Sequence, residues 1–107
     1  MLVNNNRDKL EEIFLFYLSV NDGEEKKWDK YFFYNLLSNH NNYFFYNNLE
    51  KGYLIVSSTN EDIDIIALAI DKERRRNGGA SKLLKELIEF AKKKKYFKNN
   101  FRSILRE

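Results

Sequence analysis

The sequence contains no cysteine, no proline, one histidine and only four glycines in 107 residues. The absence of cysteine excludes disulfides, thiolate metal ligands and a cysteine nucleophile, and it is typical of a cytoplasmic protein. The single His40 lies among asparagines, and one imidazole cannot form a metal site alone, so we predict no metal. No uninterrupted apolar run approaches the roughly 18 residues of a membrane span, and the polar first residues do not resemble a secretion signal.

Charge of either sign is not in large excess. The chain carries 19 Lys and Arg against 16 Asp and Glu, a net charge of +3, which does not by itself indicate a nucleic-acid-binding protein. The one local excess lies at the C-terminal end, in Lys92, Lys93, Lys94, Lys95, Lys98, Arg102 and Arg106. We interpret this basic end as a solvated surface; contact with nucleic acid is the alternative.

Hydrophobic periodicity predicts two helices at the start of the chain. The first, after capping residues in Asn4–Asp8 and before the stop signal Asn21–Gly23, has an apolar stripe at Leu10, Ile13, Phe14, Tyr17 and Leu18. The second has Trp28, Tyr31, Phe32 and Leu36 on one face. A loop over Ser38–Asn42 ends it.

The middle of the chain has the composition of strands. Tyr43–Tyr46 and Tyr53–Val56, joined by the turn Asn47–Gly52, predict a β-hairpin. Ile63–Ile70 is almost continuously apolar, which predicts a central strand buried on both faces.

A long amphipathic helix follows, and the chain ends in a weaker pattern. The helix has an apolar stripe at Ala80, Leu83, Leu84, Leu87, Ile88 and Ala91. Its solvent-facing side carries the i,i+4 pairs Lys82–Glu86 and Lys85–Glu89. Phe101–Leu105 is predicted as a short last strand. We therefore expect one α+β domain over residues 1–107.

Two of the four glycines, Gly78 and Gly79, stand together directly after Arg74–Arg76, between the strand and the long helix. The first turn of a helix has N–H groups without partners and the positive end of the helix dipole, and glycines let an anion approach them closely. This arrangement predicts a phosphate site. The spacing excludes both a Walker loop and a dinucleotide-binding G-x-G-x-x-G loop. The alternative is that the glycines only permit a tight turn.

The segment Arg75-Arg76-Asn77-Gly78-Gly79-Ala80 matches R/Q-x-x-G-x-G/A, the acetyl-CoA signature of the GNAT family of N-acetyltransferases. The surrounding strand, loop and helix, residues 63–95, resemble motif A of that family in order and length. The resemblance implies a GNAT-like fold: two helices, antiparallel strands, and a central strand followed by a long helix. It implies acetyl-CoA as co-substrate and transfer of an acetyl group to an amine, which a small molecule or a protein could carry.

The resemblance also implies roles for individual residues. The loop and helix start would hold the CoA phosphates, and the strand end would pair with the pantetheine arm while a backbone N–H polarises the thioester carbonyl. The residues concerned are Arg75, Arg76, Asn77, Gly78, Gly79, Ala80, Ser81 and Lys82 for the phosphates, and Leu68, Ala69 and Ile70 for the arm. Asp64 is the candidate base that would make the amine neutral, with Glu61 and Asp62 as weaker candidates. The alternative for Asp64 is a strand-end carboxylate bonded to a neighbour.

The pattern departs from the family after the long helix. The family continues with further strands and a helix that often supplies a tyrosine acid, and Tyr96 does not have that tyrosine's context. We therefore expect a C-terminally shortened member, which a homodimer could complete. The alternatives are a catalytically inactive CoA-binding module, or a module that binds protein or nucleic acid. The amino-acid bias indicates an AT-rich genome and fits a phage or mobile element.

Overall fold

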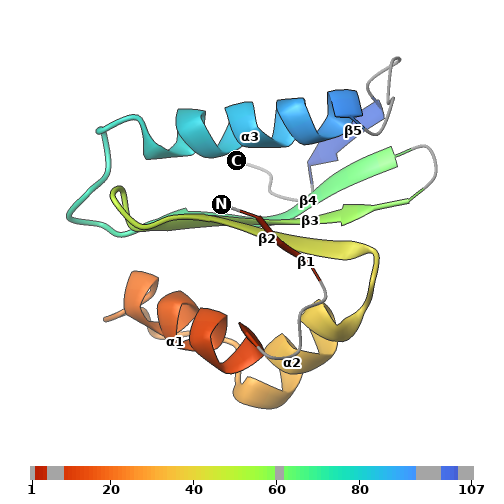
Figure 1. Cartoon of the computed structure of the whole chain (residues 1–107). Coiled ribbons are helices and arrows are strands. Elements are labelled where there is room, and N and C mark those ends of the chain that lie inside the picture. The colour runs from red at the N-terminus through yellow and green to blue at the C-terminus, as the bar shows by residue number, and fades with distance from the viewer. Residues whose placement is uncertain (1, 5–8, 60–61, 94–99, 104–107) are drawn as a thin grey trace.

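The computed structural model describes residues 2–4, 9–59, 62–93 and 100–103, with side chains for 9–59 and 62–93. One five-stranded sheet forms the middle layer (Figure 1). Two helices, α1 (Leu10–Val20) and α2 (Lys30–Ser38), cover one face of it, and α3 (Gly79–Lys93) covers the other. Among the described helices, none has both the length and the apolar character that crossing a bilayer requires.

The strands follow the chain order across the sheet. They are β1 (Leu2–Asn4), β2 (Asn42–Asn47), β3 (Gly52–Ser58), β4 (Asp62–Ile70) and β5 (Asn100–Ser103). The predicted hairpin is confirmed, since Asn42 pairs with Ser57 and Asn47 with Gly52. The predicted last strand is confirmed as far as Ser103, and its pairing with β4 is parallel. Strand β1 was not predicted, and it places Asn4 in the sheet rather than in a helix cap.

Aromatic rings fill the layer between the sheet and the helices α1 and α2. The predicted stripe of α1 is confirmed, because Leu10, Ile13 and Tyr17 are buried. The predicted face of α2 is wrong: Tyr31 and Phe32 are exposed, and Phe33 and Leu37 are buried instead. The reason is that the helix begins only at Lys30, where the Asp29 carboxylate accepts a 2.8 Å hydrogen bond from the Phe32 N–H. Trp28 precedes the helix and takes no part in its stripe.

Helix α3 packs on the opposite face of the sheet. The predicted stripe is confirmed at Leu83, Leu87 and Ala91, all buried against β2, β3 and β4. It is wrong at Ile88, which is 46% exposed, and Phe90 is buried in its place. The contact with Phe90 comes from the rings of Tyr43 and Phe45, which both point from β2 toward α3.

Strand β4 is less buried than its apolar sequence predicts. Ile63 is buried, but the residues from Asp64 to Ile70 are only half-buried. β4 is an inner strand, between β3 and β5, and the β5 pairing stops at Ile65. The second half of the strand therefore has β3 on one side and no described strand on the other.

Candidate functional site

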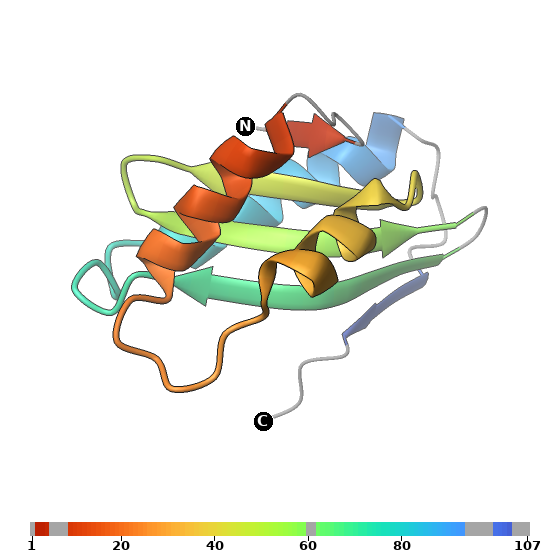
Figure 2. The ribbon, with the colours of Figure 1, turned by 90° about the horizontal axis from the view of Figure 1, so that it is seen from below.

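The strands β4 and β5 form a fork. Their parallel pairing runs from Asp62 opposite Asn100 to Ile65 opposite Ser103, the last described residue of β5, and Figure 2 shows β5 at an angle to β4. Within the described residues, no strand pairs with Ile66–Ile70 on this side. An unpaired strand edge offers a row of backbone N–H and C=O groups to an extended ligand.

A β-bulge lies at the point where the fork opens. Ile55 pairs with Ala67 and Val56 with Ile65, so Ile66 is an extra residue on β4. Beyond the bulge, the Asp71 N–H donates to the Lys51 carbonyl on the β3 side, at 2.8 Å. Because backbone groups alternate between the two edges of a strand, those of Leu68 and Ile70 are directed toward the open edge.

The open edge leads into the loop that joins β4 to α3, residues 71–78. Gly78 has a φ of +82° and Arg76 a φ of +75°, both in the left-handed region. A Cβ atom added to Gly78 would meet nothing within 4 Å. The loop conformation therefore favours glycine at residue 78, and the space beside it is open.

Gly79 is a glycine for a different reason. A Cβ atom here would lie 2.8 Å from the Glu50 Cβ and 3.2 Å from the Ile70 Cδ1. The first residue of α3 thus sits against the turn between β2 and β3 and against the end of β4. The tight-turn alternative accounts for the positive φ of Gly78, and close packing accounts for Gly79, so the two glycines alone do not decide between a turn and a ligand site.

The start of α3 presents unpaired donors to the same region. The Lys82 N–H donates to the Gly78 carbonyl at 3.0 Å, so the helical bonds begin there. The N–H groups of Gly79, Ala80 and Ser81 precede this bond and have no acceptor within the helix. They lie at the positive end of a helix of 15 residues.

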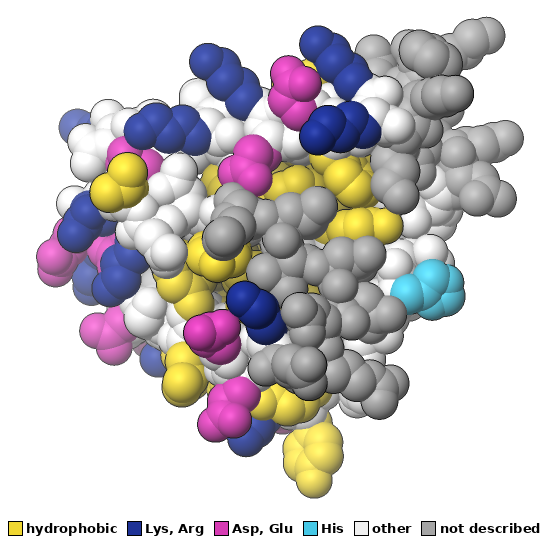
Figure 3. Space-filling view, in the orientation of Figure 1, with side chains coloured by type: hydrophobic (Ala, Val, Ile, Leu, Met, Phe, Trp, Pro, Cys, Tyr) yellow, Lys and Arg dark blue, Asp and Glu magenta, His cyan; other side chains and the backbone are white. Residues whose placement is uncertain are grey.

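The three arginines have different surroundings. Arg74 Nη1 donates to the Leu49 carbonyl at 2.7 Å, and Arg75 Nε donates to the Ile70 carbonyl at 3.0 Å. The Arg75 guanidinium is therefore held at the open edge of β4. Among the described residues, the Arg76 side chain has no hydrogen bond or ion pair and is exposed. Figure 3 shows charged side chains gathered at this end of the molecule.

Asp64 lies one residue before the last pair of the fork. It is half-buried and stands opposite Ser57 on β3 and Arg102 on β5 in register. Side-chain alternation places it on the α1 and α2 face, because Ile63 and Ile65 both pack on the α3 side. Six residues of strand separate it from Ile70, about 20 Å at the usual rise. Of the weaker candidates, Asp62 begins β4, and Glu61 lies outside the described residues, as does Tyr96.

The connection between α1 and α2, residues 21–29, forms a further side of this region that the sequence did not indicate. Asn21 Nδ2 donates at 2.8 Å to the Tyr53 hydroxyl, and Tyr53 stands opposite Ala69 on β4. Burial raises the pKa of Tyr53 to about 12, and the Asn21 bond opposes that rise. A Cβ on Gly23 would lie 3.3 Å from the Lys72 Nζ, so the connection also reaches the loop after β4. Asn21 and Gly23 had been interpreted only as a helix stop.

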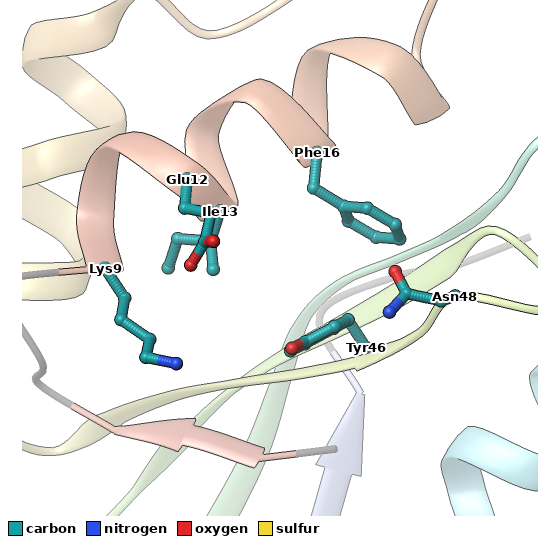
Figure 4. A pocket seen from close by; sticks show the side chains of 6 residues that line it. All are labelled: Lys9, Glu12, Ile13, Phe16, Tyr46 and Asn48. Carbon is teal, nitrogen blue, oxygen red and sulfur yellow. The ribbon is translucent and has the colours of Figure 1, made fainter.

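A separate hollow lies between α1 and β2 (Figure 4). Lys9, Glu12, Ile13, Phe16, Tyr46 and Asn48 line it. The strand order places β2 two strands away from β4, so this hollow is not part of the fork. Among the described residues, no group of three or more His, Asp or Glu side chains could hold a metal ion.

The fork, the bulge and the glycine loop follow one another along β4 to the start of α3. The model of the acetyltransferase (GNAT) family matches residues 7–104. The chain therefore belongs to the GNAT acetyltransferase family. This confirms both the resemblance and the predicted α+β fold. A search of curated proteins found no match.

Solved structures share the fold at low sequence identity. A ribosomal-protein-alanine N-acetyltransferase from Brucella melitensis biovar Abortus matches with a TM-score of 0.70 and 14% identity, over 100% of this chain and 77% of its own. An aminoglycoside acetyltransferase from an uncultured soil metagenomic sample, in complex with sisomicin, matches with a TM-score of 0.67 and 20% identity, over 100% of this chain and 75% of its own. A GNAT-family acetyltransferase from Staphylococcus aureus Mu50 matches with a TM-score of 0.57 and 24% identity, over 87% of this chain and 66% of its own.

Proposed function

We propose that this protein is an acetyl-CoA-dependent N-acetyltransferase. The observation that carries the proposal is the continuity of two features: the open edge of β4, from Ile66 to Ile70, leads directly to the exposed loop at Gly78 and the start of α3. An extended arm on that edge and an anionic group at that loop are the two halves of CoA. The family to which the chain belongs gives the reaction type.

The phosphates are assigned to the loop and the helix start. The backbone N–H groups from Asn77 to Ser81 and the positive end of α3 favour the pyrophosphate. Arg75 and Arg76 add charge from the two sides of the loop, Arg75 from the open edge itself. The pantetheine arm is assigned to the Leu68 backbone, and Ala69 and Ile70 continue the strand from there toward the loop.

The reaction is a direct attack of a neutral amine on the thioester carbonyl. A C–N bond forms, the C–S bond breaks, the amine gives up a proton and the CoA thiolate takes one. A strand N–H at the open edge would stabilise the developing oxyanion. We assign the base to Asp64, whose carboxylate at the fork would accept the proton that the attacking amine loses.

We assign the acceptor side to the α1 and α2 face, beside the connection 21–29. This connection carries four exposed carboxylates, those of Asp22, Glu24, Glu25 and Asp29, against two exposed ammonium groups, those of Lys26 and Lys27, and it is fixed to β3 through the bond from Asn21 to Tyr53. Two of the similar structures are an aminoglycoside acetyltransferase and a ribosomal-protein-alanine N-acetyltransferase. An amine is cationic before it is deprotonated, and negative charge favours its approach. The proposed acceptor class is therefore a cationic amine.

The test is a calorimetric titration with acetyl-CoA and with CoA at moderate salt. We expect saturable binding that Arg75→Ala weakens and Gly78→Glu abolishes, while Lys85→Ala, an exposed change in the same helix, leaves it unchanged. An absence of binding up to millimolar cofactor would contradict the proposal. An assay of thiol release with a panel of amines then separates transfer from binding, because binding without release would make the chain a CoA-binding module.

A further inference from the structure

We propose that the turn between β2 and β3, residues 48–51, positions the phosphate loop, and that Glu50 is its main positioning residue. The proposal rests on the proposed function, because it assigns a role in binding the same cofactor. The turn and the loop belong to separate parts of the sequence and lie at the same end of the sheet (Figure 1).

Three polar contacts join the turn to the loop. Arg74 Nη1 donates to the Leu49 carbonyl at 2.7 Å, and the Asp71 N–H donates to the Lys51 carbonyl at 2.8 Å. The Lys51 ammonium lies 3.7 Å from the Asp71 Oδ2. Both ends of the segment Asp71–Arg74 are therefore bonded to the turn, at Lys51 and at Leu49, the two residues on either side of Glu50.

Glu50 fastens the helix start itself. Its Oε1 lies 3.0 Å from the Lys82 Nζ, and its Cβ is the atom nearest to Gly79 in the contact described above. The Glu50 side chain is only 13% exposed, against 54% for Lys82. Glu50 thus contacts the first and fourth residues of α3, the turn of helix that carries the unpaired N–H groups.

The turn is held in a fixed shape before it makes these contacts. The Glu50 N–H donates to the Asn47 Oδ1 at 3.0 Å, and Lys51 has a φ of +51°. A residue other than glycine keeps this left-handed backbone conformation only where the surrounding structure stabilises it. A rigid turn can set the orientation of a helix start that packs on it.

The proposal can be tested by the direction in which CoA affinity changes when the Glu50 charge is removed. A carboxylate beside a phosphate site repels the ligand, so by Coulomb's law alone its removal strengthens CoA binding. If Glu50 positions the helix start, its removal weakens binding instead. The Lys82 ammonium is also engaged by Glu50, so Lys82 acts through this pair rather than directly on a phosphate.

The experiment compares the CoA affinity of wild type, Glu50→Gln, Glu50→Ala and the exchanged pair Glu50→Lys with Lys82→Glu. The matched control is Glu89→Gln, which removes the same charge from an exposed position of α3. We expect Glu50→Ala to weaken CoA binding by about fivefold and Glu50→Gln by less, because Gln keeps the packing over Gly79. We expect the exchanged pair to bind within about twofold of wild type and the control to bind as wild type does.

Two results would overturn the proposal. Equal or tighter CoA binding by Glu50→Ala would show that the carboxylate is only a repelling charge. Weaker binding by the exchanged pair than by Glu50→Ala would make Lys82 a direct phosphate ligand. Amide hydrogen exchange adds a readout without cofactor: we expect the Lys82 N–H to exchange faster in Glu50→Ala than in the control, and equal rates would also overturn the proposal. A wild type that binds no CoA would contradict the proposed function alone, because the exchange measurement tests the turn separately.

Discussion

The adjacent glycines should differ in their response to alanine substitution, since one is packed and the other faces open space. In Gly79→Ala the new Cβ would lie 2.8 Å from the Glu50 Cβ, an atom at the base of its side chain that cannot swing aside freely. In Gly78→Ala the new Cβ meets nothing within 4 Å, and the only penalty is the positive φ of +82°.

The magnitudes follow from these two geometries. Forcing a methyl group into a packed contact costs about 1–3 kcal/mol, and the better helix propensity of alanine returns up to about 1 kcal/mol of that. The left-handed conformation costs alanine about 1–2 kcal/mol, and the stiffer unfolded chain offsets about half of this. We expect Gly79→Ala to lower the free energy of unfolding by about 1 kcal/mol more than Gly78→Ala. A difference of this size corresponds to about 4–8 °C in melting temperature for a domain of this length.

The assay is urea unfolding together with calorimetric CoA binding for both variants. For CoA affinity we expect Gly78→Glu to lose all binding while remaining folded, and Gly79→Ala to weaken binding only in part, because its methyl group disturbs the contact with Glu50. Gly23→Ala is the matched control: Gly23 has a φ of +87°, so it carries the same strain away from the helix start. A Gly78→Glu variant that binds CoA as wild type does would refute the assignment of the open space to the phosphates.

Three further outcomes can be measured on single variants. Phe33 is fully buried against three other aromatic rings, so Phe33→Ala should lower the free energy of unfolding by about 3–5 kcal/mol in urea. The pKa of Tyr53 is raised from the ordinary 10.0 to about 12 in the folded protein, so the wild type should lose up to about 3 kcal/mol of its free energy of unfolding between pH 10 and 12. Tyr53→Phe should not show this part of the loss when unfolding is measured across the same pH range. Asp64→Asn should lower kcat about a hundredfold or more and leave the CoA Kd unchanged, and an unchanged kcat would exclude Asp64 as the base.

The sequence predicted the elements whose pattern repeats over many residues or is fixed by a local turn. Helix α3 has apolar residues at helical spacing over 15 residues, and the β2–β3 hairpin has an aromatic run and a mainly aliphatic run on the two sides of a turn. The glycine loop was predicted because each of its requirements, a strand, two glycines and a helix start, lies within one short segment. These features depend on neighbours in the sequence.

The features that the sequence missed depend on contacts between distant residues. The predicted face of α2 was wrong because Asp29 sets the start of the helix. Trp28, which precedes Asp29, stacks on Tyr17 with the ring centroids 5.4 Å apart, and its backbone N–H donates to the Tyr17 hydroxyl. No local periodicity reports a stacking partner in another helix. Strand β1, with three residues, is too short to form a pattern at all.

The same limit applies to the candidate site, where a short motif alone does not distinguish a cofactor loop from a turn. The conformation of Gly78 would be the same in both cases, because it is a property of the loop backbone. The cofactor loop is favoured by the edge of β4, which is open beside Leu68 among the described residues. If a strand were paired along that edge, the arginine and glycine loop could keep the same conformation, but the backbone groups of β4 would not be accessible to an extended arm. The fork therefore carries the functional argument, and the motif gives the place where the fork ends.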